Sequence, residues 1–397
     1  MGHIGRRSDL VTLYERVKDM SYNKTHRIAL TALLLSGIML CSCRKDSIIT
    51  GNPGQDGLSA PDTEHPLALN PLPFSDTDEA ASPGTRGEAP VTDISISSMG
   101  VFAGYREKGD FSDDTRSNDY INNSMYYLVS STGTWQWNFP TYWPIAGRLS
   151  IFAYSPYDAT LNLRDDTGYP SFRYTPLSEV RHQVDFCVAE PKLNMSKTDE
   201  AIPLHFRHTM AGILINMNYT GTLPLAEYYV KVDRIALNGL IGTKELVFLP
   251  EDPHFSWEEY TASTKTATYE LKRTKDAFET QIKDVELPKK DADNTNHIHV
   301  NPDGGALYLL PQTTDAATIS VTYGYYQANG TGETMMMRFE STSELPAATW
   351  EAGKYTKYKM TLDIGHASIL RITVEEGGTM IEPYITAQET AEDHKVE

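Results

Sequence analysis

Cysteine is scarce in this chain of 397 residues, which contains only three: Cys41, Cys43 and Cys187. The first two close an apolar run near the N-terminus, so Cys187 is the only thiol of the chain that follows. One thiol excludes a disulfide framework within a single chain. Cys187 stands in the strand-like run 184–188, where it is predicted to be a small buried hydrophobic residue rather than a nucleophile.

The sequence also lacks the short motifs of common enzymes. It contains no G-x-S-x-G elbow, Walker loop, H-E-x-x-H pair or dinucleotide fingerprint. His297 and His299 would share one face of a short strand, but no third metal ligand is identifiable beside them. No enzymatic activity, metal or cofactor is therefore expected.

Basic residues are fewer than acidic ones: the chain has 35 Lys and Arg against 53 Asp and Glu, which gives a net charge of −18. Residues 1–43 contain six basic and three acidic residues, or +3, which leaves about −21 for the rest of the chain. A field of this sign repels nucleic acid and anionic lipid, so neither is expected as a partner.

The N-terminal region has the pattern of an export signal. Lys24 and Arg27 precede an apolar run of about a dozen residues, 28–39, which is too short to span a bilayer. The run ends in Leu40-Cys41-Ser42-Cys43, which looks like a bacterial lipobox, with cleavage before Cys43 and lipid on its thiol. An ordinary cleaved signal is the alternative. Met20 would give a signal of conventional length, so the true start stays open.

Residues 43–90 are predicted to be a lipidated tether, because Pro, Gly, Ser, Asp and Glu dominate them. One segment within them, Leu67–Phe74, is apolar enough to form a strand. Its two prolines, Pro71 and Pro73, exclude it from a sheet centre and predict an edge strand.

From Ile94 onward the pattern is all-β, since short runs of alternating apolar and polar residues recur between Gly, Asn, Asp and Pro clusters. The clearest stripes are Ile319, Val321, Tyr323 and Tyr325; Tyr358, Met360, Leu362 and Ile364; Leu370, Ile372 and Val374; and Tyr228, Val230 and Val232. The stripes predict antiparallel sandwiches with one dry face on each sheet. A domain boundary is expected near residue 198, with the segment 221–226 as the alternative.

Several phrases in a fixed order carry a family resemblance. They are Trp137, Tyr142-Trp143-Pro144, Gly147, Leu149 to Pro156, Gln183 to Phe186, Pro203 to His208, Leu307 to Gln312, Ile319 to Tyr323 and Trp350 to Tyr355. Through these phrases and the lipobox, nearly the whole chain after the signal resembles the fimbrillin family, the type V pilus subunits of Bacteroidales. The resemblance implies two tandem transthyretin-like β-sandwich domains. We place them at 91–198 and 199–378, behind the signal (1–42) and before a tail (379–397).

The resemblance also implies how such a subunit assembles. The precursor is a lipoprotein of the outer membrane, and an extracellular protease cuts it after an arginine, here Arg86, leaving Gly87 as the new N-terminus. An ordinary solvated arginine in a linker is the equal alternative for Arg86. The first strand then leaves and a neighbouring subunit's C-terminal segment takes its place. The apolar residues of the removable strand are Leu67, Leu69, Leu72 and Phe74. The donor candidates are Ile381, Pro383 and Ile385, and a frayed terminus is the equal alternative.

The expected function is that of a structural subunit of a cell-surface fimbrium that mediates adhesion, with other pilus subunits as partners. The alternatives are a tip or anchor subunit, or an anchored lipoprotein that binds a glycan or a host protein. By the resemblance, Trp137 and Trp143 are framework residues in a core, and His205 and His208 are packing residues. Trp135 stays open as a sugar-stacking residue.

Overall fold

The structure is a computed structural model. It describes residues 59–73, 95–111, 118–162, 169–178, 180, 183–260, 264–272, 298–300, 306–330, 332–380 and 384–385. All regular elements of these residues are β-strands, numbered β1 to β26, and no α-helix occurs among them. The all-β class predicted from the alternating pattern is confirmed. In the described part of the chain, no helix is long and apolar enough to cross a membrane.

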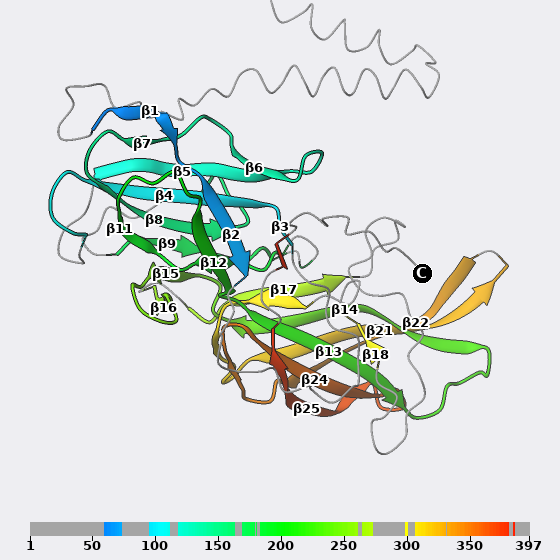
Figure 1. The fold of residues 1–397 in the computed structure, drawn as a ribbon. Coiled ribbons are helices and arrows are strands. Elements are labelled where there is room, and N and C mark those ends of the chain that lie inside the picture. The colour runs from blue at the N-terminus through cyan, green and yellow to red at the C-terminus, as the bar shows by residue number, and fades with distance from the viewer. Residues whose placement is uncertain are drawn as a thin grey trace, which may run out of the picture. The chain divides into compact units, whose positions relative to one another are not determined.

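The first large sheet has eight strands in the order β2-β12-β10-β8-β4-β5-β6, with β11 also paired to β8 (Figure 1). The strands are β2 (Leu69–Pro73), β4 (Ser98–Arg106), β5 (Asn118–Val129), β6 (Thr134–Trp137), β8 (Arg148–Ser155), β10 (Cys187–Ala189), β11 (Lys192–Met195) and β12 (Ile202–His208). Every pair is antiparallel except β2 with β12. The predicted edge strand is thus β2, which ends the sheet.

Both faces of this sheet carry an apolar core, which explains why β8 is almost continuously buried. Leu149 and Ile151 belong to one core, while Phe152 and Tyr154 belong to another on the opposite face. The second core includes Phe248, whose ring centroid lies 5.4 Å from that of Phe152.

Three small sheets lie beside the large one. They pair β1 (Pro61–Pro66) with β7 (Tyr142–Pro144), β9 (Ser171–Tyr174) with β15 (Lys244–Phe248) and β16 (Phe255–Glu259), and β3 (Ser95–Ile96) with β26 (Tyr384–Ile385). The middle sheet supplies aromatic side chains to the second core, including Phe172 and Phe248.

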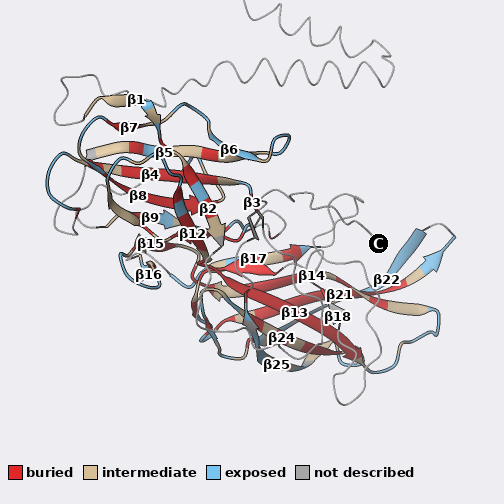
Figure 2. Ribbon diagram, viewed as in Figure 1, coloured by how far each residue is buried: buried red, intermediate tan, exposed pale blue. Residues whose placement is uncertain are grey.

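Two further sheets face each other over one apolar core. One joins β13 (Ala211–Thr220) to β18 (Ile298–His299), β19 (Leu307–Leu309) and β24 (Lys354–Asp363), with β25 (Ser368–Thr379) beyond. The other is β17 (Ala267–Lys272), β14 (Tyr228–Leu240), β21 (Thr318–Asn329) and β22 (Gly332–Glu344). A short pair, β20 (Gln312–Thr313) with β23 (Thr349–Trp350), completes the described strands. Figure 2 shows β13 and β21 largely buried and β22 largely exposed, while β14 is a mixture of buried and half-buried residues.

The predicted stripes line this core. Residues of the stripes in β21 and β24 are almost fully buried there, and Ile364 follows them. Val230 and Val232 are buried in the same core, with Tyr228, Ile372 and Val374 packed at its margin. The alternation read from the sequence therefore identified the dry face of each of these strands correctly.

Two extended parallel pairings accompany the antiparallel ones: β2 with β12 and β13 with β24. Parallel neighbours need a long crossover between them, and in both cases many intervening strands supply it. The chain passes from the first large sheet to the sheet that contains β13 between His208 and Ala211.

The predicted domain limits, including the boundary near residue 198, stay predictions. The signal region and the tether outside residues 59–73 lie beyond the described residues.

Candidate functional site

The edge strand β2 is held to the first sheet by a continuous parallel register. Leu69 stands opposite Ile202, and the pairing runs on to Pro73 opposite Phe206. The amide of Ile202 also donates a hydrogen bond to the carbonyl of Ala68 at 3.0 Å. A segment from the N-terminal end of the described residues thus forms the last strand of this sheet, next to β12.

Side chains of the same segment enter the core of the sheet. Leu67 and Leu69 are 2% and 3% exposed, and both pack in the core that contains Tyr126 and Phe206. Leu72 is half-buried at its margin. Phe74 lies outside the described residues. The pattern is that of a strand whose alternate side chains fill pockets of the sheet beneath.

Two aromatic side chains of the sheet bind the backbone of this segment. The indole Nε1–H of Trp137 donates to the carbonyl of Leu67 at 2.7 Å. The hydroxyl of Tyr126 donates to the carbonyl of Leu69 at 3.1 Å. Burial raises the pKa of Tyr126, against the effect of the hydrogen bond to Leu69, so the phenol stays a donor at neutral pH. The sheet therefore recognises main-chain carbonyls here, independent of the side chains that carry them.

The strand before it, β1, pairs with β7 and is also held by an ion pair. The carboxylate of Asp62 lies 2.5 Å from Nζ of Lys197 and 2.9 Å from Nδ1 of His65. These contacts, that of Lys197 first, lower the pKa of Asp62 to about 2. Because Lys197 follows β11, this contact joins the N-terminal segment to the body of the sheet.

Trp135 lies on β6, the strand at the opposite edge from β2. It is half-buried, and its ring stacks on Tyr126 with centroids 5.7 Å apart and 15° between the planes. One ring face therefore has a partner within the protein. Its role as a sugar-stacking residue stays a prediction. Trp143 is 1% exposed, which confirms that it is a core residue.

Most residues of the expected maturation pathway lie outside the described residues: Cys43, Arg86, Gly87, Ile381 and Pro383. Their roles stay predictions. Ile385 is described as part of β26, whose backbone pairs in parallel with β3 so that Ile385 stands opposite Ile96.

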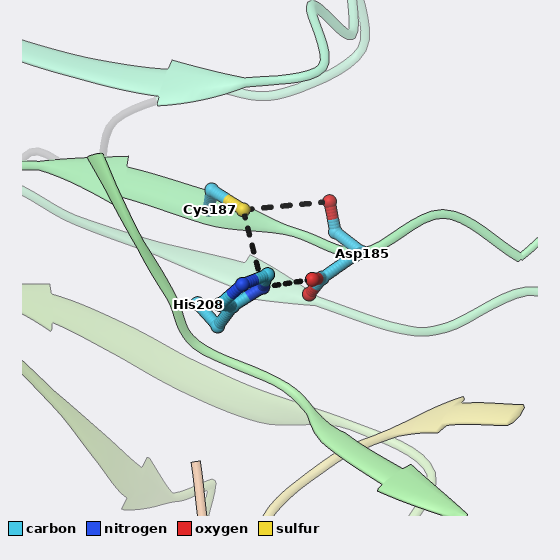
Figure 3. Close-up of side chains that lie close together, drawn as sticks. All are labelled: Asp185, Cys187 and His208. Carbon is cyan, nitrogen blue, oxygen red and sulfur yellow. Dashed lines mark hydrogen bonds and ion pairs between the residues drawn. The ribbon is translucent and has the colours of Figure 1, made fainter. Parts of the chain in front are cut away.

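A buried polar cluster lies near the end of β12 and includes Cys187 and His208, which were predicted from the sequence to be packing residues. Cys187 and His208 are direct partners across β10 and β12, and Asp185 precedes Cys187 by two residues. Nδ1 of His208 contacts Oδ2 of Asp185 and lies 3.9 Å from Sγ of Cys187 (Figure 3). The spacing of Asp185 and Cys187, which places both side chains on one side of an extended chain, was the signal available in the sequence.

This cluster does not have the geometry of a catalytic triad. In such a triad the imidazole uses one nitrogen for the nucleophile and the other for the carboxylate. Here Sγ of Cys187 and Oδ2 of Asp185 both face Nδ1 of His208. The imidazole therefore cannot pass a proton from the thiol towards the carboxylate through its ring.

The fold and the edge strand define a class: a β-sheet protein in which an N-terminal segment completes, in parallel, a sheet built from later strands. A family model described as fimbrillin-like matches residues 95–376, most of the chain. The chain belongs to the fimbrillin-like family, as the resemblance predicted. The segment 59–73, with β1 and β2, precedes the matched region.

The solved structures to which the chain is similar include proteins from Bacteroides species, all with TM-scores below 0.5. A fimbrial protein from Bacteroides vulgatus is 16% identical, with 70% of this chain and 91% of that chain covered and a TM-score of 0.46. A protein from Bacteroides ovatus assigned to cell adhesion is 15% identical, with 83% and 99% covered and a TM-score of 0.44. Another protein assigned to cell adhesion, from Bacteroides uniformis, is 13% identical, with 80% of this chain and 99% of that chain covered and a TM-score of 0.42. No curated protein sequence matches the chain.

Proposed function

We propose that the protein is a subunit of a cell-surface fimbrium that serves adhesion, exported as a lipoprotein and assembled by exchange of its first strand. The observation that carries this proposal is the attachment of Leu67–Pro73. Its strand, β2, ends a sheet and pairs with a single strand, β12, and the segment inserts Leu67 and Leu69 into the core.

Loss of the segment would leave the rest of the sheet incomplete in two ways. Apolar pockets would open around Phe206, and the donors of Trp137 and Tyr126 would lose their carbonyl partners. Buried donors without partners and apolar surface in water are both unfavourable. An extended peptide from a neighbouring subunit relieves both, because any main chain offers the same carbonyls.

The order of residues along the chain supports the proposed maturation. Leu67 to Phe74 lies between the proposed lipid site at Cys43 and the proposed cleavage site after Arg86. One cut there separates the lipid and the first strand together from the sheet, and only non-covalent contacts then hold the strand. The lipid anchors the precursor in the outer membrane, and the cut subunit becomes free to join a fimbrium. Residues 379–387, with Ile381, Pro383 and Ile385, supply the donor strand.

A disulfide across β2 and β12 tests the exchange. Asn70 and Pro203 are exposed and stand opposite each other in the register. Neighbouring strands lie about 4.8 Å apart, within the Cα range of about 4.4–6.8 Å that a disulfide accepts. In the pair N70C/P203C, protein cut at Arg86 should retain its first strand and fail to polymerise until a reductant is added.

The matched control is Y127C/Q136C, which joins β5 to β6, two strands that stay in the sheet. This protein should polymerise after the cut with or without reductant. If reduced N70C/P203C, cut at Arg86, neither releases its first strand nor polymerises, donor-strand exchange is wrong for this chain. A chain that ends at residue 378 should accept a strand from a neighbour but donate none, which separates the two roles.

A further inference from the structure

Asp185, Cys187 and His208 form a compact set of three ligand types on two paired strands. Their side-chain donor atoms all lie within 4.8 Å of one another. Cys187 and His208 are held opposite each other by the register of β10 and β12, so their backbones are fixed by main-chain hydrogen bonds. Figure 3 shows the three side chains converging on one point between the strands.

All three side chains are removed from water. The exposed fractions are 2% for Asp185, 1% for Cys187 and 7% for His208. One oxygen of the Asp185 carboxylate, Oδ2, contacts His208, but the other, Oδ1, is buried without a hydrogen-bond partner. A buried carboxylate oxygen without a partner costs free energy and indicates a ligand of positive charge.

Burial raises the pKa of Asp185, and the charge of His208 opposes the rise. Burial therefore disfavours the ionised carboxylate unless a positive charge lies beside it. The pKa values of Tyr174 and Tyr308 are raised as well, chiefly by burial and further by the charges of Asp185 and Cys187, so both phenols stay neutral.

We propose that Asp185, Cys187 and His208 bind a divalent transition-metal ion, with zinc as the preferred ion. A thiolate, an imidazole and a carboxylate are the three ligand types that zinc takes in proteins, and thiolate with imidazole selects against magnesium and calcium. A dication with two anionic ligands and one neutral imidazole is uncharged as a whole, which suits a buried position.

The geometry requires a small adjustment. Bond lengths of about 2.3 Å to sulfur and about 2.0 Å to nitrogen place these atoms about 3.6 Å apart around a tetrahedral ion. Sγ of Cys187 and Nδ1 of His208 lie 3.9 Å apart, close to that value. Nδ1 of His208 and Oδ2 of Asp185 are in direct contact, and this pair moves apart when the ion takes the imidazole nitrogen and Oδ1, the carboxylate oxygen that has no partner. The ion then replaces the proton that this pair shares and joins β10 to β12.

Binding is balanced by proton release. The thiol of Cys187 gives up one proton, and the Asp185–His208 pair gives up the second, so two protons leave for each dication that enters. The complex keeps the net charge that the three protonated groups had before binding. Calorimetry of zinc binding in buffers with different ionisation enthalpies should therefore report two protons released per ion.

X-ray absorption at the zinc edge tests the ligand set without altering it. Full-length protein with Cys41 and Cys43 replaced by Ser has Cys187 as its only thiol. After chelator treatment and addition of one equivalent of zinc, we expect one tightly held zinc with a single sulfur at about 2.3 Å. Zinc bound only by nitrogen and oxygen would overturn the proposal, and so would failure to retain zinc.

Cobalt gives a second test with matched variants. The same protein with Co2+ should show a thiolate-to-cobalt charge-transfer band in the near ultraviolet. Cys187→Ser should abolish this band. Asp185→Asn should weaken cobalt binding by at least about 10-fold, because loss of a residue that only orients a metal ligand already lowers metal affinity by about 10–100-fold. His205→Asn, on the same strand as His208, should leave the band unchanged. A band that persists in Cys187→Ser would contradict the assignment.

Discussion

Trp137 donates its indole Nε1–H to the main-chain carbonyl of Leu67 over 2.7 Å, which ties the body of the sheet to the segment proposed to leave it. The bond recognises backbone, so an incoming strand of different sequence can replace the partner. Under the proposed strand exchange, the same Trp137 donor would bind the first strand of the precursor and then the strand that replaces it.

Trp137→Phe should weaken the attachment of the first strand. The ring stays apolar, but the carbonyl of Leu67 loses its donor, which costs about 1–3 kcal/mol for a buried group. We expect lower stability of the uncut protein in urea and faster release of the first strand after cleavage at Arg86. Trp135→Phe, on the same strand, is the control, because Trp135 stacks on Tyr126 and is not the donor to Leu67. Equal release rates for both variants would mean that the Trp137 bond does not retain the strand.

Leu69→Ala should destabilise the precursor. Leu69 is 3% exposed in the core, and removing a buried leucine side chain to alanine costs about 2–5 kcal/mol through lost burial and the cavity left. Urea unfolding of the uncut protein measures this. Asn70→Ala, at the exposed neighbouring position, should change stability by no more than about 0.5 kcal/mol. A loss below about 1 kcal/mol for Leu69→Ala would contradict the buried position.

The sequence predicted β2 because its signals are local. Pro71 and Pro73 lack an amide hydrogen, so one side of their strand has no backbone donor at these two positions, and the structure places them on the strand that ends the sheet. The direction of pairing could not be predicted in the same way. The alternation of apolar residues and the positions of the prolines are the same in a parallel and in an antiparallel edge strand. The partner segment, Ile202–Phe206, also lies far from β2 along the chain, so no local signal identifies it.

The buried polar cluster was missed for a related reason. Cys187 and His208 each have a sufficient explanation as packing residues when they are considered singly. The contact depends on the register of β10 with β12, a non-local property that places Cys187 opposite His208. Only the spacing of Asp185 and Cys187 was local, and two polar or reactive residues two positions apart in a strand are weak information without the partner.

Asp185→Ala should destabilise the protein strongly when a chelator is present. The change leaves the buried imidazole of His208 without its carboxylate, and breaking one side of a buried pair costs about 3–5 kcal/mol. The double variant D185A/H208A should cost clearly less than the sum of the two single variants, because it removes both groups.

His205→Ala is the control for that cycle. His205 lies on the same strand, and its Nδ1 is 3.5 Å from a carboxylate oxygen of Glu190 with both side chains about one-third exposed. Exposed pairs of this kind contribute about 0–1 kcal/mol. Additive losses for Asp185→Ala and His208→Ala in urea unfolding would show that the two residues act independently.

Asp62→Asn should remove a pH dependence from the attachment of β1. Lys197 and His65 lower the pKa of Asp62 from 3.8 to about 2 in the folded protein. Below the unfolded value the unfolded chain binds more protons, so stability falls as the pH drops from about 4 to about 2. The contribution is complete above pH 4 and lost below pH 2. The protection of the β1 amides from hydrogen exchange, corrected for the intrinsic exchange rate at each pH, should therefore fall towards acid across this range in the unaltered protein.

In Asp62→Asn the same amides should exchange faster already at pH 5 and lack the additional step between pH 4 and pH 2 that Asp62 causes. Glu64→Gln removes an exposed carboxylate from the same strand and should keep that step. Lys197→Met should behave like Asp62→Asn, because it removes the contact that lowers the pKa most. A step that survives in both Asp62→Asn and Lys197→Met would have to come from another carboxylate, and Asp62 would then not be the group that fixes β1.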